Sequence, residues 1–349
     1  MKKRILAVLI ATALAVSVTG CAGNATSSSD STSASSVAES SDTSTQTSAD
    51  TSSEDESKEE SSQEESKDLE ANYTKYTLDG DLTQHMIDMS RLNEGNKVRL
   101  ANVIKKLKNG EEVTVGFIGG SITQGTSAGN DLCYAKLTAD WLQKTYSNAK
   151  INYVNAGIGA TGSYIGVHRV ANDLLSKNPD LVFVEFSVND TTENTERNKK
   201  SYDGLLRTIW KSSTNPAIIT IATTQEDGTS FQDQHAEIVK HYDLPMISYR
   251  NTILDTIKHG DIVWKDISDD NIHPNVPGHK IVSQLLQAYI SDVDKDVDNI
   301  SGSESDFTTP ATDAPIENGS LIQPSSATDV TATGAFGNYE QQFGGFDGF

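Results

Sequence analysis

The chain has 349 residues, two cysteines and a formal net charge of −21. Its acidic residues gather at the two ends: residues 1–70 hold 13 acidic and 5 basic residues, and residues 301–349 hold seven acidic residues and no Lys or Arg. The middle is therefore only mildly acidic, and it lacks the basic stripe of a nucleic-acid-binding protein. Two cysteines also exclude a disulfide framework and a cysteine-based zinc site.

The first twenty residues have the pattern of an export signal. Basic residues at positions 2–4 precede the uncharged apolar run 5–18, which is shorter than the roughly 20 residues that span a bilayer. Cys21 follows a pair of small residues, Thr19 and Gly20, and this arrangement resembles the lipobox of bacterial lipoproteins. We therefore expect a signal peptide over 1–20, a lipid anchor on Cys21, and a location on the extracellular face of the bacterial cell membrane. A plain cleaved signal is the alternative.

Two segments are too polar to bury a core. Residues 22–70 consist almost entirely of Ser, Thr, Asp and Glu, which predicts a disordered, extended linker. Residues 301–349 are acidic and rich in Gly, Ser and Thr, and we expect a disordered tail there as well. The folded domain should therefore occupy residues 71–300, which is enough for one sizeable core.

Within residues 71–300, short apolar runs alternate with longer amphipathic ones. This alternation is typical of βαβ units and predicts an α/β fold, a three-layer α/β/α sandwich around five parallel strands. A long helix is expected before the sheet, over 86–107, and another after it, over 276–292. The expected strands are 113–118, 151–154, 181–186, 217–221 and 245–248.

Ligands of such sheets bind beyond the carboxyl ends of the strands, and polar or small residues follow three of the expected strands. A fourth polar group, a carboxylate three residues before a histidine, precedes the last expected helix. Together they offer a nucleophile, a base, a group to orient the base, and neutral donors for an oxyanion. The four segments are Gly119-Gly120-Ser121, the loop 155–163, Ser187-Val188-Asn189-Asp190, and Asp270-Asn271-Ile272-His273-Pro274.

In order and register, these four segments resemble the conserved blocks of the SGNH, or GDSL-type, serine hydrolases, over roughly residues 113–286. The resemblance implies a flavodoxin-like sandwich in which Ser121 is the nucleophile, His273 the general base and Asp270 its orienting carboxylate. It also implies an oxyanion hole built from the Ser121 N–H, one amide of the second block and the Asn189 side chain. No metal or cofactor is implied.

The chain departs from the family pattern at two positions. Gly120 stands where many members have an aspartate before the nucleophile. Ala160 falls where the second block has its amide-donating glycine, with Gly157 a few residues earlier. The resemblance therefore leaves open which of these two amides completes the oxyanion hole, and an alanine can serve if its backbone does not require glycine.

Two other residues near the blocks have competing interpretations. Glu185, in an otherwise apolar strand, is either a buried acid with a raised pKa or, as we favour, a carboxylate hydrogen-bonded to neighbouring loops. Ser127 lies in a Gly-x-Ser-x-Gly motif, but no strand leads into it, as a nucleophile elbow would require. Elsewhere, Arg169 and Asp173 are spaced to pair on one helix.

Export and the family resemblance together predict a surface-anchored esterase. The Gly-Gly-Ser-Ile-Thr sequence at the nucleophile resembles that of bacterial carbohydrate esterases, so the expected substrate is an acylated, above all acetylated, polysaccharide, cleaved through an acyl-enzyme intermediate by a monomer. The alternatives are a lysophospholipase- or thioesterase-type lipid hydrolase and a non-catalytic glycan-binding module of the same fold.

Overall fold

The computed structural model describes residues 73–191, 194–317 and 319. The predicted signal peptide, the anchor at Cys21, the linker over 22–70 and the tail beyond residue 319 lie outside the described residues. Within the described part, no helix has the length and apolar character needed to cross a bilayer.

In this described part of the chain, six strands form one sheet in the order β1-β6-β5-β4-β2-β3. The five predicted strands are all present, as neighbours in parallel pairing, and only the added edge strand β1 (Arg91–Asn93) runs antiparallel. The prediction of an all-parallel, five-stranded sheet was therefore wrong at this edge. The parallel strands are β2 (Glu112–Gly119), β3 (Lys150–Gly157), β4 (Leu181–Glu185), β5 (Ala217–Ala222) and β6 (Met246–Ser248).

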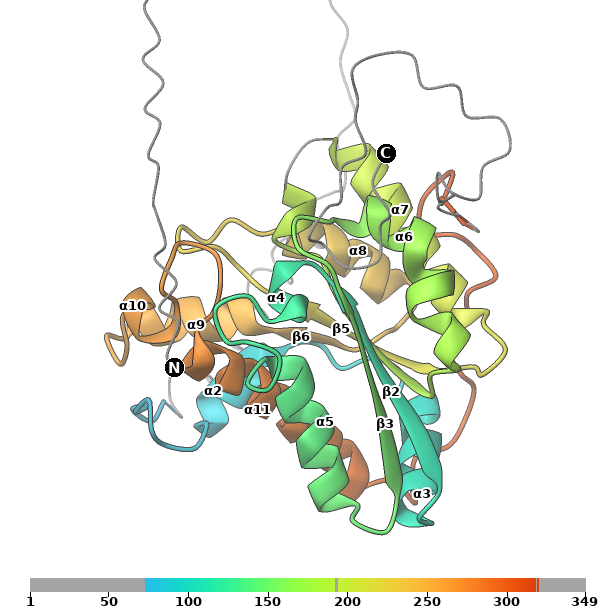
Figure 1. The fold of residues 1–349 in the computed structure, drawn as a ribbon, viewed down its shortest axis with the longest axis horizontal. Helices are drawn as coiled ribbons and strands as arrows, with labels where there is room; N and C mark the ends of the chain where they lie inside the picture. Colours follow the sequence, from blue (N-terminus) through green and yellow to red (C-terminus); the bar gives the residue numbers. More distant parts are fainter. Residues whose placement is uncertain (1–72, 192–193, 318, 320–349) are drawn as a thin grey trace, which may run out of the picture. The chain divides into compact units, whose positions relative to one another are not determined.

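Helices cover both faces of the sheet, as expected for a three-layer sandwich (Figure 1). One face is covered by α2 (Gln84–Ser90), α3 (Val98–Lys108), α5 (Tyr134–Thr145), α9 (Tyr249–Lys258) and α11 (Val276–Lys295). The other face is covered by α6 (Ser163–Asp173), α7 (Thr195–Trp210) and α8 (Gln232–His241). Short helical turns make up the remainder: α4 (Ser121–Gln124), α10 (Trp264–Ile267), η1 (Leu175–Lys177) and η2 (Asn189–Thr191).

The long helix predicted over 86–107 is interrupted by β1, which separates α2 from α3. The interruption ends in a turn at Gly95, which has a left-handed φ of +61°. A Cβ atom at this glycine would lie 2.2 Å from the backbone nitrogen of Pro245, so the chain can pass the start of β6 only with glycine here. Apolar residues recur at helical spacing before the break, at 86, 89 and 92, and after it, at 100, 103, 104 and 107, which is why a single helix was expected although no apolar residue lies between 93 and 97.

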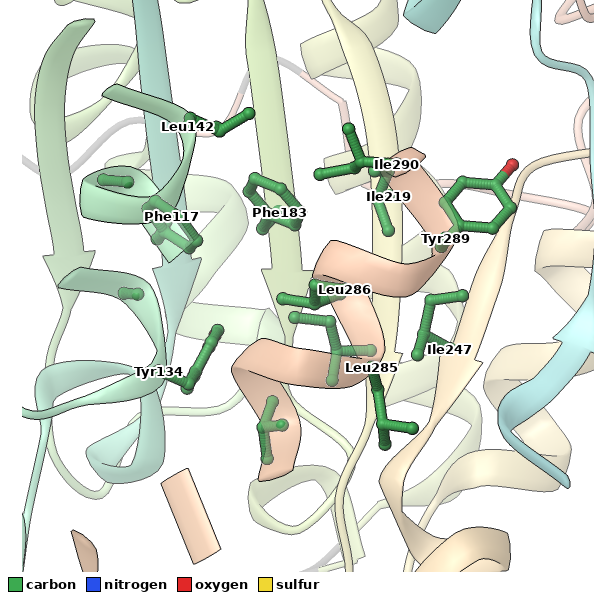
Figure 2. Close-up of a cluster of buried hydrophobic side chains, with 14 of the residues drawn as sticks. Phe117, Tyr134, Leu142, Phe183, Ile219, Ile247, Leu285, Leu286, Tyr289 and Ile290 are labelled. Carbon is green, nitrogen blue, oxygen red and sulfur yellow. The ribbon is translucent and has the colours of Figure 1, made fainter. Parts of the chain in front are cut away.

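The core consists of two apolar layers, one on each face of the sheet. Side chains alternate along β2, so that Val115 and Phe117 lie in the layer under α5 and α11, whereas Ile118 lies in the other. Phe117 stacks on Phe183 of β4 with ring centroids 4.6 Å apart. Figure 2 shows these rings beside the leucine and isoleucine side chains of α11. Burying a side chain of this size typically contributes about 1.5–3 kcal/mol, so this layer fixes the strands that lead to the site.

The domain predicted to end at residue 300 extends through residue 317. Phe307 is buried between Trp210 and Tyr242, with ring centroids 4.5 and 3.9 Å away and nearly parallel planes. Further along, the backbone of Ile316 lies directly on α7, where a Cβ atom at Gly204 would come within 1.8 Å of the Ile316 oxygen. The segment 301–317 has few large apolar residues and no regular period, so its composition suggested disorder although two aromatic contacts hold it.

Replacing Phe307 with alanine should lower the free energy of unfolding by about 3 kcal/mol, at the lower end of the range for buried phenylalanine because the site is at the domain edge. Urea unfolding measures this loss. Thr309→Ala, an exposed change in the same segment, should unfold at the midpoint of the unaltered protein. An unchanged midpoint for Phe307→Ala would contradict the packing of this segment.

Candidate active site

Three of the four sequence blocks leave the sheet from one row of paired residues. Gly119, at the end of β2, is paired with Gly157 at the end of β3 and with Glu185 at the end of β4. The chain therefore leaves all three strands at the same level, and the segments that follow begin side by side. Ser121 and Asn189 therefore lie just beyond the carboxyl ends of the parallel strands, where ligands of such sheets bind.

Ser121, His273 and Asp270 form a continuous chain of hydrogen bonds. The Ser121 Oγ lies 2.9 Å from His273 Nε2, and His273 Nδ1 lies 2.8 Å from Asp270 Oδ2. This is the geometry of a hydroxyl nucleophile, a base within reach of its proton, and a carboxylate that orients the base. The structure thus brings together the three residues that the sequence predicts, and their catalytic role remains a prediction.

The Asp270 carboxylate is held in its ionised form by the loop that carries it. Its Oδ1 accepts hydrogen bonds from the backbone N–H groups of Ile272 and His273, at 2.7 and 2.6 Å. Partial burial pushes the pKa of Asp270 upward, but these backbone bonds and the bond from the His273 ring outweigh it, so the pKa lies below its usual value. An ionised Asp270 fixes the imidazole with Nδ1–H toward the carboxylate and Nε2 toward Ser121.

Two residues that the sequence analysis missed brace this loop. The indole N–H of Trp264 donates to the backbone oxygen of Asp270 at 2.6 Å. The hydroxyl of the buried Ser268 lies within hydrogen-bond distance of two backbone oxygens, those of His273 at 2.6 Å and Asp270 at 2.8 Å. Neither residue belongs to a motif, and only the folded loop reveals their contribution to its shape.

The two candidate amides of the second block differ in their hydrogen bonding. The Gly157 N–H donates to the Asn155 side chain at 2.9 Å, so it is already occupied. Within the described residues, the Ala160 N–H makes no hydrogen bond. Ala160 has a left-handed φ of +58°, a conformation that alanine adopts at a cost of roughly 1–2 kcal/mol. Of the two amides, only that of Ala160 remains for an external acceptor.

The Asn189 carboxamide occupies the space that a side chain at position 120 would need. A Cβ atom at Gly120 would lie 1.9 Å from Asn189 Oδ1 and 2.7 Å from its Cγ. Any residue with a side chain at position 120 would therefore displace the Asn189 carboxamide from its present position. The glycine, where the family pattern has an aspartate, thus leaves room for Asn189 to lie directly beside the nucleophile turn.

Glu185 satisfies both interpretations that its sequence suggested. It is fully buried, and its Oε1 accepts hydrogen bonds from the Ser187 N–H and hydroxyl and from the Thr223 hydroxyl, at 3.1, 3.2 and 2.7 Å. Burial raises the pKa of Glu185 to about 7, although these hydrogen bonds oppose the shift. Its other oxygen, Oε2, has no hydrogen-bond partner within the described residues, so its charged form is incompletely stabilised.

Arg169 joins the ends of the first two parallel strands. The guanidinium is almost fully buried and donates to the backbone oxygens of Gly119 and Ala156, at 2.9 and 2.6 Å. Its predicted pairing with Asp173 is also confirmed, at 3.2 Å. Ser127, by contrast, is exposed on the loop after α4 and makes no hydrogen bond to a histidine in the described part of the chain.

Glu185→Gln should change how stability depends on pH. The raised pKa means that folded Glu185 holds its proton up to about pH 7, whereas an unfolded glutamate releases it near pH 4.5. The contribution of Glu185 to the free energy of unfolding is therefore greatest below pH 4.5. It declines by up to about 3 kcal/mol as the pH rises through 7. Glutamine retains an oxygen acceptor without the charge, so this decline should disappear.

Urea unfolding at pH 5 to 8 measures the effect, with the exposed Glu111→Gln as the matched control. Relative to the unaltered protein, Glu185→Gln should gain stability between pH 5 and 8, and Glu111→Gln should not. Parallel pH curves for all three proteins would mean that Glu185 is ionised throughout this range.

The chain is similar to one protein family and to two solved structures of an esterase. Residues 117–281 match the GDSL-like Lipase/Acylhydrolase family. A solved two-domain esterase (CEX) active on acetylated mannans, co-crystallised with mannopentaose, has 38% identity and a TM-score of 0.60, covering 65% of this chain and 60% of that one. A second structure described as the same esterase has 37% identity and a TM-score of 0.65, covering 68% and 64%.

The chain therefore spans less than two thirds of the length of these two structures. No curated protein matches it. The family match covers the segment that carries Ser121, Asn189, Asp270 and His273, and the chain shares its α/β fold with the two esterase structures.

Proposed function

We propose that this protein is a serine esterase that removes acetyl groups from a polysaccharide, with acetylated mannan as the first candidate. The main observation that supports this proposal is the chain of hydrogen bonds from Ser121 through His273 to Asp270. The substrate class is supported by the two similar structures, which belong to an esterase active on acetylated mannans.

In this proposal, His273 Nε2 accepts the Ser121 hydroxyl proton as Oγ attacks the ester carbonyl. The tetrahedral intermediate collapses to an acetyl-enzyme, and the imidazolium returns the proton to the departing sugar oxygen. His273 then takes a proton from water, whose hydroxide attacks the acetyl-enzyme, and returns it to Ser121 as acetate leaves. Asp270 stabilises the imidazolium in both halves.

The oxyanion is held by three neutral donors: the Ser121 N–H, the Ala160 N–H and the Asn189 carboxamide. Ala160 is preferred to Gly157 because the Gly157 amide already donates to Asn155. One such donor typically contributes about 3 kcal/mol to transition-state stabilisation, so the fit between Gly120 and Asn189 has a direct effect on rate.

The proposal also includes a lipid anchor at Cys21 and a position on the extracellular face of the membrane. Acetylated polysaccharides are too large to import intact, so an enzyme tethered outside the cell meets them directly. The acidic segment 22–70 would then separate the catalytic domain from the membrane, because like charges keep such a chain extended.

Acetate release from a panel of acetylated mannan, xylan, pectin, chitin oligomers and peptidoglycan tests the substrate class. We expect release from mannan, with rates reduced by at least about 10³-fold in Ser121→Ala because the nucleophile is lost. Cleavage of long-chain esters or thioesters alone would indicate a lipid hydrolase. Binding to a glycan without Ser121-dependent hydrolysis would indicate a non-catalytic module.

A double-mutant cycle tests whether Gly120 affects the rate through the Asn189 carboxamide. Asn189→Ala should lower kcat for an acetyl ester by about 10²–10³-fold. Gly120→Ala should lower it at least about tenfold, because the new Cβ displaces the same carboxamide, and the double variant should be no worse than Asn189→Ala alone.

Ser127→Ala, in the exposed loop after α4, is the control for this cycle and should retain the original kcat. Full activity in Gly120→Ala would show that Asn189 need not occupy its present position. Multiplicative losses in the double variant would mean that residues 120 and 189 act independently.

A further inference from the structure

A cluster of metal-ligating side chains lies on elements that carry none of the triad. His85 is in α2, whereas Asp255 and His259 lie at the end of α9, with His259 as its C-cap residue. Each offers one ligand atom, and these three atoms lie within 4.8 Å of one another. The cluster joins the first helix of the described chain to a helix that follows the last strand.

Both imidazoles approach the same carboxylate oxygen. Asp255 Oδ2 lies 2.6 Å from His85 Nε2 and 3.3 Å from His259 Nδ1. In a tetrahedral zinc site with bonds of about 2.0–2.1 Å, neighbouring ligand atoms lie about 3.3 Å apart. To admit an ion, the His85 and Asp255 atoms would therefore need to separate from 2.6 Å to about 3.3 Å, whereas the His259 and Asp255 atoms already have this spacing.

The surroundings restrict the orientation of the two rings. Tyr73 stacks on His259 with ring centroids 4.2 Å apart and meets the His85 ring edge-on at 5.5 Å. The Tyr73 hydroxyl donates to Asp261 Oδ1 at 2.6 Å. His85 is buried, and the side chains of Asp255 and His259 are only 13% and 17% exposed. The ligand set is thus partly preorganised, as supporting contacts of a metal site are.

We propose that His85, Asp255 and His259 form a divalent transition-metal site, suited to zinc, that fastens α2 to α9. Two imidazoles and one carboxylate match the ligand preference of Zn²⁺ and not that of Ca²⁺ or Mg²⁺, which bind mainly oxygen. His259 Nδ1 also lies 3.0 Å from the backbone oxygen of Asp255. A hydrogen bond between them requires a proton on Nδ1, and a metal ion that binds this nitrogen displaces that proton. Three protein ligands leave one position for water.

Zinc titration of the chelator-treated full-length protein tests this site by calorimetry, with a calcium titration beside it. We expect one zinc ion bound per chain, no comparable calcium binding, and a melting temperature raised by about 5 °C at saturation, because the ion binds the folded state. His259→Gln and His85→Ala should each abolish the zinc-dependent rise. His241→Ala, at an exposed histidine on α8, should retain it.

His259→Gln keeps a polar side chain at a partly exposed position, so it serves even if the buried His85→Ala variant fails to fold. Ester hydrolysis should persist in His259→Gln, since the cluster is separate from the triad, and this establishes that the variant is folded. Equal zinc binding by the unaltered protein and His259→Gln, or no zinc binding by either, would overturn the proposal.

Discussion

The register of the three parallel strands β4, β2 and β3 determines the layout of the candidate site. Because Gly119 is paired with both Gly157 and Glu185, the nucleophile turn, the second block and the segment bearing Asn189 all start at one level. A shift of one residue in either pairing would move every side chain of that strand to the opposite face. The apolar layers that flank the sheet resist such a shift, so core packing and site geometry depend on the same pairing.

Buried polar side chains hydrogen-bond to groups at and just beyond the ends of these strands. Arg169 donates to the oxygens of Gly119 and Ala156, and Glu185 accepts from Ser187 and Thr223. Buried polar groups of this kind are costly unless they are hydrogen-bonded. Their arrangement is consistent with a role in shaping backbone turns, since most of their partners are groups at the ends of strands.

The fold class, the five parallel strands and the proximity of Ser121, His273 and Asp270 could be predicted from the sequence. Each follows from a local pattern: a short apolar run or a compact motif such as that from Asp270 to His273. Features set by contacts between distant segments could not be predicted. After β1, the chain passes close to Pro245 at Gly95. In residues 301–317, Phe307 packs between Trp210 of α7 and Tyr242, the C-cap residue of α8. Neither contact produces a repeating pattern of apolar residues in the sequence.

The site combines two parts that are stabilised by different means. The nucleophile and the proposed oxyanion donors follow the sheet, and their positions depend on strand register and on the close approach of Gly120 and Asn189. His273 and Asp270 instead lie on a loop held by Ser268 and Trp264, outside the row of strand ends. The 2.9 Å contact between Ser121 and His273 is where the two parts meet, so a change in either part alters the geometry that proton transfer requires.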